Sequence, residues 1–66
     1  MIKQWLGKKK CDLCGTTESK YFVDGKTNSG PWAFQCATCW QIRGVLKLGA
    51  GFGQKYNGTT FVKIEG

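Results

Sequence analysis

Hydrophobic and polar residues form a strand-like pattern in the first half of the chain. Residues 20–24 (KYFVD) and 32–35 (WAFQ) are rich in aromatic and β-branched side chains, as strands are. Residues 25–31 between them hold glycines, an asparagine and the sole proline, which favour a turn. The pattern predicts a β-hairpin from Lys20 to Gln35. Alternation along its first strand puts Phe22 and Asp24 on one face and the residues between and before them on the other.

The pattern changes near Ala37. No glycine interrupts residues 37–43, and Cys39, Ile42 and Leu46 recur at the spacing of one helical face. Gly44 stands where such a helix would end. We therefore expect a short helix from about Ala37, with Cys39, Ile42 and Leu46 on one face.

Glycines dominate residues 44–58, which include the run GAGFG at 49–53. One interpretation is a phosphate-binding loop, but the run has no P-loop lysine and follows no strand–helix unit of the nucleotide-binding type. We favour a close-packed loop that folds back over the cysteine pairs, with Leu48, Phe52 and Tyr56 covering the core. A last strand is expected at 59–64, after a turn at Asn57-Gly58, and a short strand is expected around Trp5-Leu6.

Two cysteine pairs carry the strongest chemical signal in the sequence. Twenty-one residues separate the two C-x₂-C pairs. Each such turn brings two thiolates to one side of an ion, and two turns complete the tetrahedral shell that Zn²⁺ prefers. Iron can occupy the same thiolates. The pattern predicts one structural Zn²⁺, held by Cys11, Cys14, Cys36 and Cys39.

Other uses of four cysteines fit the sequence less well. Two disulfides need an oxidising compartment, and residues 1–6 carry no apolar run resembling a signal peptide. A thioredoxin-like redox pair needs a βαβ unit, for which 66 residues leave no room. Reduced thiols that bind a metal fit a cytoplasmic protein.

Size and charge refine this prediction. A chain of 66 residues predicts a single mini-domain in which metal binding supplements a small core, divided into a metal core (11–43), a glycine-rich loop (44–58) and a C-terminal strand (59–64). The formal charge is +6. Four thiolates remove four positive charges and Zn²⁺ restores two, which leaves about +4 and a reduced preference for negatively charged partners. No stretch approaches the roughly eighteen apolar residues of a membrane span, so we expect no membrane partner.

The predicted fold is a small metal-stabilised α+β domain made of a zinc knuckle, a β-hairpin and a short helix. Gly15 follows the first cysteine pair, where a positive φ lets backbone N–H groups approach the sulfurs. Rubredoxin and zinc-ribbon proteins have Cys-Gly in both knuckles, whereas Trp40 follows the second pair here. We therefore favour a treble-clef-like arrangement and keep a zinc ribbon as the alternative.

Several stretches resemble one known family. They are residues 22–27 (FVDGKT), 30–33 (GPWA), 36–39 (the second cysteine pair), 44–45 (GV) and 48–56 (LGAGFGQKY). Together they are similar to a family of very small proteins found mainly in bacteriophage genomes and treated as zinc-binding proteins of unknown function. The resemblance spans residues 11–56 and implies zinc, a phage origin and the cytoplasm of a host cell, but no biochemical role. That family often has His after the fourth cysteine, where this chain has Trp40.

An enzyme is the function class that the sequence supports least. The chain has no histidine, so Ser-His and Cys-His nucleophiles and a His base are excluded. Four cysteines also saturate a tetrahedral ion and leave no position for substrate. We expect a non-catalytic binding module.

Cations interleaved with aromatic residues indicate nucleic acid as the favoured partner, since aromatic rings stack on bases while Lys and Arg meet phosphates. Some of these side chains also have a simpler use: aromatic rings build the core, and Lys10 offsets the charge of the thiolates. The alternative is a protein-interaction module that binds and modulates a host protein through Trp5, Trp32 or Trp40. The candidate binding residues are Lys8, Lys9, Lys20, Lys26, Trp40 and Arg43.

Overall fold

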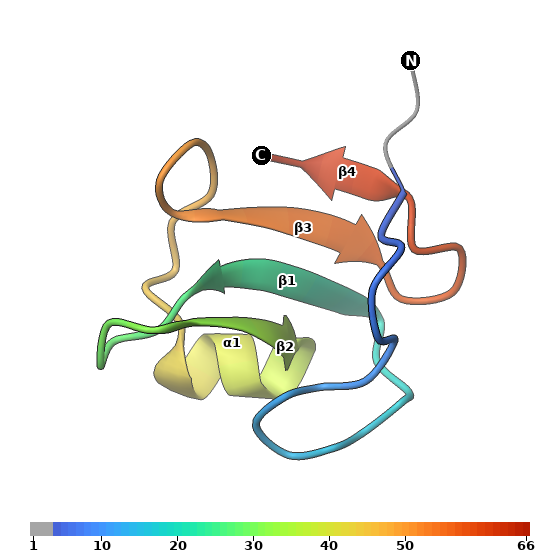
Figure 1. Cartoon of the computed structure of the whole chain (residues 1–66), viewed down its shortest axis with the longest axis horizontal. Helices are drawn as coiled ribbons and strands as arrows, with labels where there is room; N and C mark the ends of the chain where they lie inside the picture. The colour runs from blue at the N-terminus through green and yellow to red at the C-terminus, as the bar shows by residue number, and fades with distance from the viewer. Residues whose placement is uncertain (1–3) are drawn as a thin grey trace.

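The computed structural model describes residues 4–66 and contains one antiparallel sheet and one short helix (Figure 1). The sheet has the strand order β2-β1-β3-β4. The helix α1 follows β2 without a loop and lies behind the sheet in Figure 1. This is the small α+β architecture predicted from the sequence. The elements are β1 (Tyr21–Lys26), β2 (Trp32–Cys36), α1 (Ala37–Arg43), β3 (Gly53–Asn57) and β4 (Lys63–Glu65).

The predicted hairpin is present as β1 and β2. Its register pairs Phe22 with Cys36 at one end and Lys26 with Trp32 at the other. The turn is closed at Thr27, whose backbone N–H donates to the Pro31 carbonyl at 3.0 Å. The hairpin therefore places Cys36 beside the start of β1, and α1 begins at the next residue.

One face of the sheet carries the aromatic core. Phe22, Cys36 and Tyr56 face the same side because they are partners in register. The Phe22 and Phe34 rings stack with centroids 4.9 Å apart, and Trp5 stacks on the outer side of Phe34 at 4.4 Å. Three cysteines are buried in the same cluster. A metal bound by these thiols would therefore be part of the core itself.

The opposite face is covered by α1. Val23 and Gln35 are fully buried on this face, and Trp40 of the helix is only 5% exposed. The helix ends at Gly44 as predicted, where the backbone becomes extended, and a Cβ added there would clash with the Trp40 ring, so glycine is the residue that fits. The expected helical face was wrong: Ile42 is 67% exposed and Leu46 lies beyond the helix end. A helix of two turns covers the sheet with one large indole instead of a row of aliphatic side chains.

The glycine-rich segment also differs from the prediction. Residues 53–57 form β3, which pairs with β1 along its length, so they are not part of a loop. Gly53 and Gly25 are partners in register, and a Cβ on Gly53 would meet the Gly25 Cα at 3.0 Å. Here the glycine allows two strands to approach closely. The remaining loop lies at the Lys26 end of β1, away from Cys36, and leaves Phe52 41% exposed, so it does not cover the cysteine pairs.

Both ends of the described chain lie at the β4 edge of the sheet, one at each end of that strand (Figure 1). The last strand begins later than expected, because residues 58–60 form a turn in which Asn57 Oδ1 accepts the N–H groups of Thr59 and Thr60. Near the start, the described residues contain a single bridge from Gln4 to Val62 and not the expected strand around Trp5-Leu6. No helix among the described residues is long and apolar enough to cross a membrane.

Candidate metal centre

The four cysteines converge at one point of the fold. All four Sγ atoms lie within 4.8 Å of one another, and Cys14 Sγ is 3.6 Å from Cys36 Sγ. A tetrahedral ion with metal–sulfur bonds of about 2.3 Å holds its sulfurs about 3.8 Å apart. The thiols are free, and a disulfide would need sulfurs about 2.05 Å apart. This arrangement fits one metal ion held by four cysteines.

The first pair lies on a tight knuckle. Gly15 has a φ of +81°, a conformation that glycine adopts without strain, and its N–H donates to the Cys11 carbonyl at 3.0 Å. The N–H groups of Leu13 and Cys14 both point at Cys11 Sγ, at 3.4 Å. This is the turn predicted from the glycine after the second cysteine. A Cβ on Gly15 would lie 3.4 Å from Lys10 Cε, so the Lys10 side chain lies beside the knuckle.

The second pair sits at the start of α1, as predicted. Cys36 is the N-cap residue, and its Sγ accepts the backbone N–H of Cys39 at 3.5 Å. A sulfur thus replaces the side-chain oxygen that usually caps a helix. Because Cys39 lies in the first turn, the helix orients both sulfurs of this pair toward the knuckle.

Two residues that hold the site together were missed in the sequence. Asp12 connects the knuckle to β2 through two hydrogen bonds. Its backbone N–H donates to the Phe34 carbonyl at 2.8 Å, and its side-chain Oδ2 accepts the Phe34 N–H at 3.0 Å. Ser19 Oγ accepts the N–H of Ala37, at 2.9 Å, in the first turn of α1. Asp and Ser are residues that commonly bond to nearby backbone groups, but the partners here come from distant segments.

The surroundings of the three buried thiols shift their pKa values in different directions. Burial acts to raise the pKa of Cys11, but backbone N–H groups of Cys14, Cys36 and Leu13 outweigh it and lower the pKa to about 6. Burial raises the pKa of Cys36 and of Cys39, and the neighbouring thiols raise the pKa of Cys39 further. Four thiolates in this space therefore require a cation to compensate their charge.

The fold and the four convergent thiols define a small α+β protein with a candidate tetrathiolate metal centre. A scan against models of known protein families finds no match. Searches of curated proteins and of solved structures likewise return no significant match.

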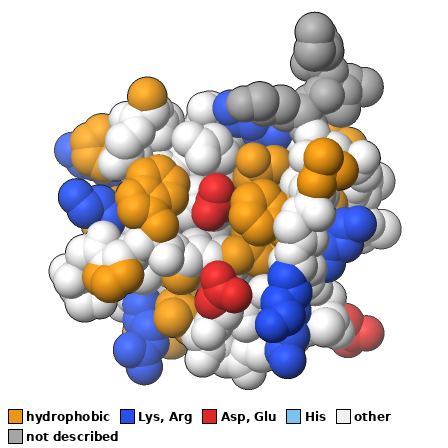
Figure 2. Space-filling view, in the orientation of Figure 1, with side chains coloured by type: hydrophobic (Ala, Val, Ile, Leu, Met, Phe, Trp, Pro, Cys, Tyr) orange, Lys and Arg blue, Asp and Glu red, His pale blue; other side chains and the backbone are white. Residues whose placement is uncertain are grey.

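The predicted binding residues do not gather on one surface. Lys8, Lys9 and Lys20 are exposed, but Lys20 and Lys26 lie at opposite ends of β1, and Arg43 ends α1. Figure 2 shows the face of the molecule opposite to α1. Acidic side chains lie in the middle of this face, and cations, coloured blue, lie around them. The structure therefore does not assemble these cations into a continuous basic strip.

Trp40 was assigned wrongly as a surface residue. Its side chain is 5% exposed and packs between the sheet and Gly44. A short helix against a small sheet needs a large side chain to exclude water, and Trp40 fills this role. The most exposed tryptophan among residues 4–66 is Trp32, at 47%.

Asp24, in the middle of β1, makes a pH dependence testable. Burial and the negative charge of Asp12 raise its pKa above the usual 3.8. The folded state thus binds the Asp24 proton more tightly than the unfolded state does, so stability falls as pH rises from 3.8 through the raised value. We expect Asp24→Asn to melt a few degrees higher than the parent at pH 7 and equally at about pH 3. Glu65→Gln, a change of an exposed carboxylate in β4, is the control in both thermal melts. A lower melting temperature for Asp24→Asn at pH 7 would contradict this assignment.

Proposed function

We propose that this protein is a non-catalytic binding module whose fold is stabilised by one Zn²⁺ at Cys11, Cys14, Cys36 and Cys39. The observation that carries the metal assignment is the convergence of four Sγ atoms within 4.8 Å. A closed site of four thiolates is typical of structural zinc and leaves no position for substrate. The order of knuckle, hairpin and helix supports a treble-clef-like description over a zinc ribbon, because residues 37–43 are helical.

A protein is the partner class that the geometry supports best. Two large apolar side chains, Leu13 and Ile42, are exposed at one cavity beside the edge strand β2, and exposed apolar side chains at a sheet edge are typical of protein interaction sites. The scattered cations and the buried Trp40 give less support to nucleic acid. If the chain is phage-encoded, as its resemblance implies, the partner would be a protein of the host cell.

Nucleic acid is the second candidate, because one end of the sheet combines exposed aromatic rings with cations. Lys26 is the register partner of Trp32. The backbone N–H of Lys26 donates to the Phe52 carbonyl at 2.9 Å. Lys47 Nζ lies 5.4 Å from the Phe52 ring centroid. Exposed rings beside lysines are the elements of a single-strand binding surface. Of the predicted binding residues, only Lys26 belongs to this group.

Binding assays at two salt concentrations distinguish these candidates. The zinc-loaded protein is mixed with labelled single- and double-stranded DNA and RNA at about 50 mM and 200 mM salt, and polarisation is recorded. In parallel, it is cross-linked in nuclease-treated cell extract. We expect no oligonucleotide binding and a specific protein cross-link that survives at the higher salt. Tight oligonucleotide binding that falls steeply with salt, and that Lys26→Gln with Lys47→Gln abolishes, would replace the protein-binding proposal with the second candidate.

A further inference from the structure

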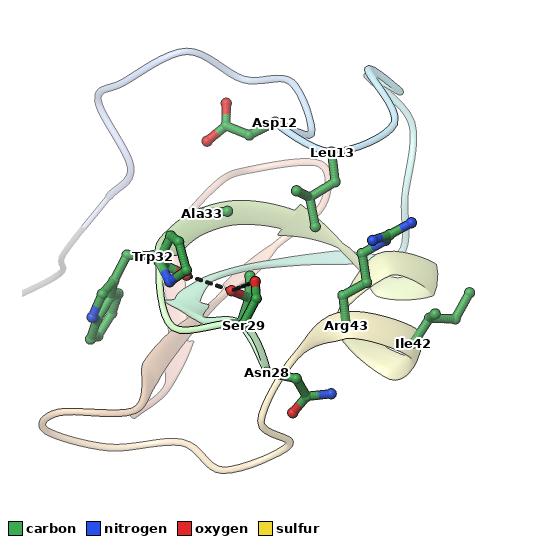
Figure 3. A pocket seen from close by; sticks show the side chains of 10 residues that line it. Asp12, Leu13, Asn28, Ser29, Trp32, Ala33, Ile42 and Arg43 are labelled. Atoms are coloured by element: carbon green, nitrogen blue, oxygen red, sulfur yellow. Dashed lines mark hydrogen bonds between the residues drawn. The ribbon is translucent and has the colours of Figure 1, made fainter.

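A cavity of about 440 Å³ opens beside the free edge of β2, between the first knuckle, the hairpin turn and the end of α1. Figure 3 shows Leu13 pointing into it from the knuckle, Arg43 rising beside it from the helix end, and Asn28 below. Ala33 contributes the wall on β2. Because separate segments build the walls, the cavity depends on the same knuckle and hairpin that position the cysteines.

The edge of β2 offers unpaired backbone groups at this cavity. Within residues 4–66, β1 is the only strand that neighbours β2 in the sheet, and alternate residues of an antiparallel strand point their N–H and C=O groups away from their neighbour. Phe34 is in such a position, where both its groups bond to Asp12. Trp32 is two residues earlier and presents its N–H and C=O to the same side, where it lines the cavity. The knuckle therefore pairs with one position of the edge and leaves the next one open.

The side chains around this open position are apolar and exposed. Leu13 of the knuckle is 41% exposed and Ile42 of the helix 67%, and both line the cavity. Trp32 borders the cavity with its backbone, while its indole points away from it (Figure 3). Natural edge strands are usually protected by charges or by covering segments, so a free edge with apolar neighbours is typical of a surface that pairs with another chain.

Charge indicates which kind of segment fits this groove. Arg43 is exposed and lines the cavity, and the formal charge of +6 for the chain falls to about +4 with four thiolates and Zn²⁺, which is still positive. The carboxylate of Asp12 also borders the cavity and keeps its negative charge, but its Oδ2 is held at the edge of β2 by the Phe34 N–H, on the knuckle side, whereas Arg43 lies on the helix side (Figure 3). A guanidinium beside an apolar hollow favours a partner with a carboxylate next to an apolar side chain.

We propose that this groove binds an extended, acidic segment of a partner protein, which adds to the edge of β2 as a further strand. The inference rests on the proposed protein-binding function and names its surface. The backbone of the segment pairs with Trp32, and the side chain opposite Ala33 enters the hollow between Leu13 and Ile42. An acidic side chain nearby meets Arg43. The knuckle at Phe34 limits the pairing to a few residues, so the apolar anchor supplies specificity.

Two sets of synthetic peptides of about ten residues test this proposal. In one set apolar residues alternate with glutamate, and in the other lysine replaces each glutamate. Polarisation with the zinc-loaded protein should show binding of glutamate peptides only. Ile42→Glu should weaken binding at least about tenfold, whereas Ile64→Glu, the same change on exposed β4, should leave it unchanged. Trp32→Pro removes the outward N–H at the first residue of β2, where proline is tolerated, and should weaken binding more than Trp32→Ala does.

Three outcomes would overturn the groove. These outcomes are that glutamate peptides fail to bind, that lysine peptides bind as well, or that Ile42→Glu and Trp32→Pro both leave binding unchanged in folded protein.

Cross-linking in cell extract distinguishes an error in the proposed groove from an error in the proposed protein-binding function. If the partner still cross-links to Ile42→Glu and Trp32→Pro, the groove is wrong and protein binding stands. If no protein cross-links and oligonucleotides bind, the protein-binding function itself is wrong. Sedimentation that shows a dimer abolished by Ile42→Glu would instead assign the edge to a second copy of the chain.

Discussion

Cys36→Ser should abolish the cooperative fold. Serine is a good N-cap residue, so the change preserves an acceptor for the Cys39 N–H at the start of α1 and removes only the thiolate. Structural zinc contributes about 10–16 kcal/mol in zinc-finger peptides, whereas small folded proteins are stable by about 5–15 kcal/mol. Losing one of four ligands therefore removes a large part of the stability. Far-UV circular dichroism and a thermal melt should show no cooperative transition near that of the parent.

The control is Thr38→Ser, a similar small change at an exposed position inside the second cysteine pair. Its melting temperature should stay within a few degrees of the parent, because Thr38 contributes no ligand. A Cys36→Ser variant that melts cooperatively at the parent's temperature would show that the thiol cluster does not stabilise the fold through a metal.

Phe22→Ala should also destabilise the protein severely. Phe22 is fully buried, and its ring stacks on Phe34 at 4.9 Å and on Phe61 at 5.4 Å. Removing a buried phenylalanine costs about 3–5 kcal/mol through lost burial and the cavity that remains. In so small a protein this is a large share of the total stability. Urea unfolding followed by tryptophan fluorescence measures the free energy of unfolding directly.

Phe52→Ala is the matched control, since it removes the same ring from an exposed position in the glycine-rich loop. We expect a loss of less than about 1 kcal/mol for this variant. Equal losses for the two variants would contradict the assignment of Phe22 to the centre of the core.

Local signals in the sequence predicted the parts of the fold that depend on neighbouring residues. The C-x₂-C spacing predicted the cysteine cluster, Gly15 predicted the positive φ of the knuckle, and Gly44 predicted the helix end. Alternation predicted the hairpin and the faces of β1. Each of these features follows from geometry within a few residues, which a single sequence records directly.

The wrong expectations concern residues whose role depends on distant contacts. The glycines at 49–53 suggested a loop over the metal, but Gly53 serves a close approach to Gly25 that only the β1–β3 pairing reveals. Trp40 was taken for a surface residue because nothing nearby indicates that two helical turns must cover Val23 and Gln35. The pairing of Asp12 with Phe34 spans 22 positions and has no local signature.

Native mass spectrometry of the purified protein tests the central claim most directly. We expect one zinc ion per chain, release of thiol protons on binding, and loss of the cooperative melt after removal of the ion by a strong chelator. Elemental analysis of the same sample distinguishes zinc from iron. A metal-free protein that melts cooperatively, with four free thiols, would contradict the claim that a metal at Cys11, Cys14, Cys36 and Cys39 stabilises this fold.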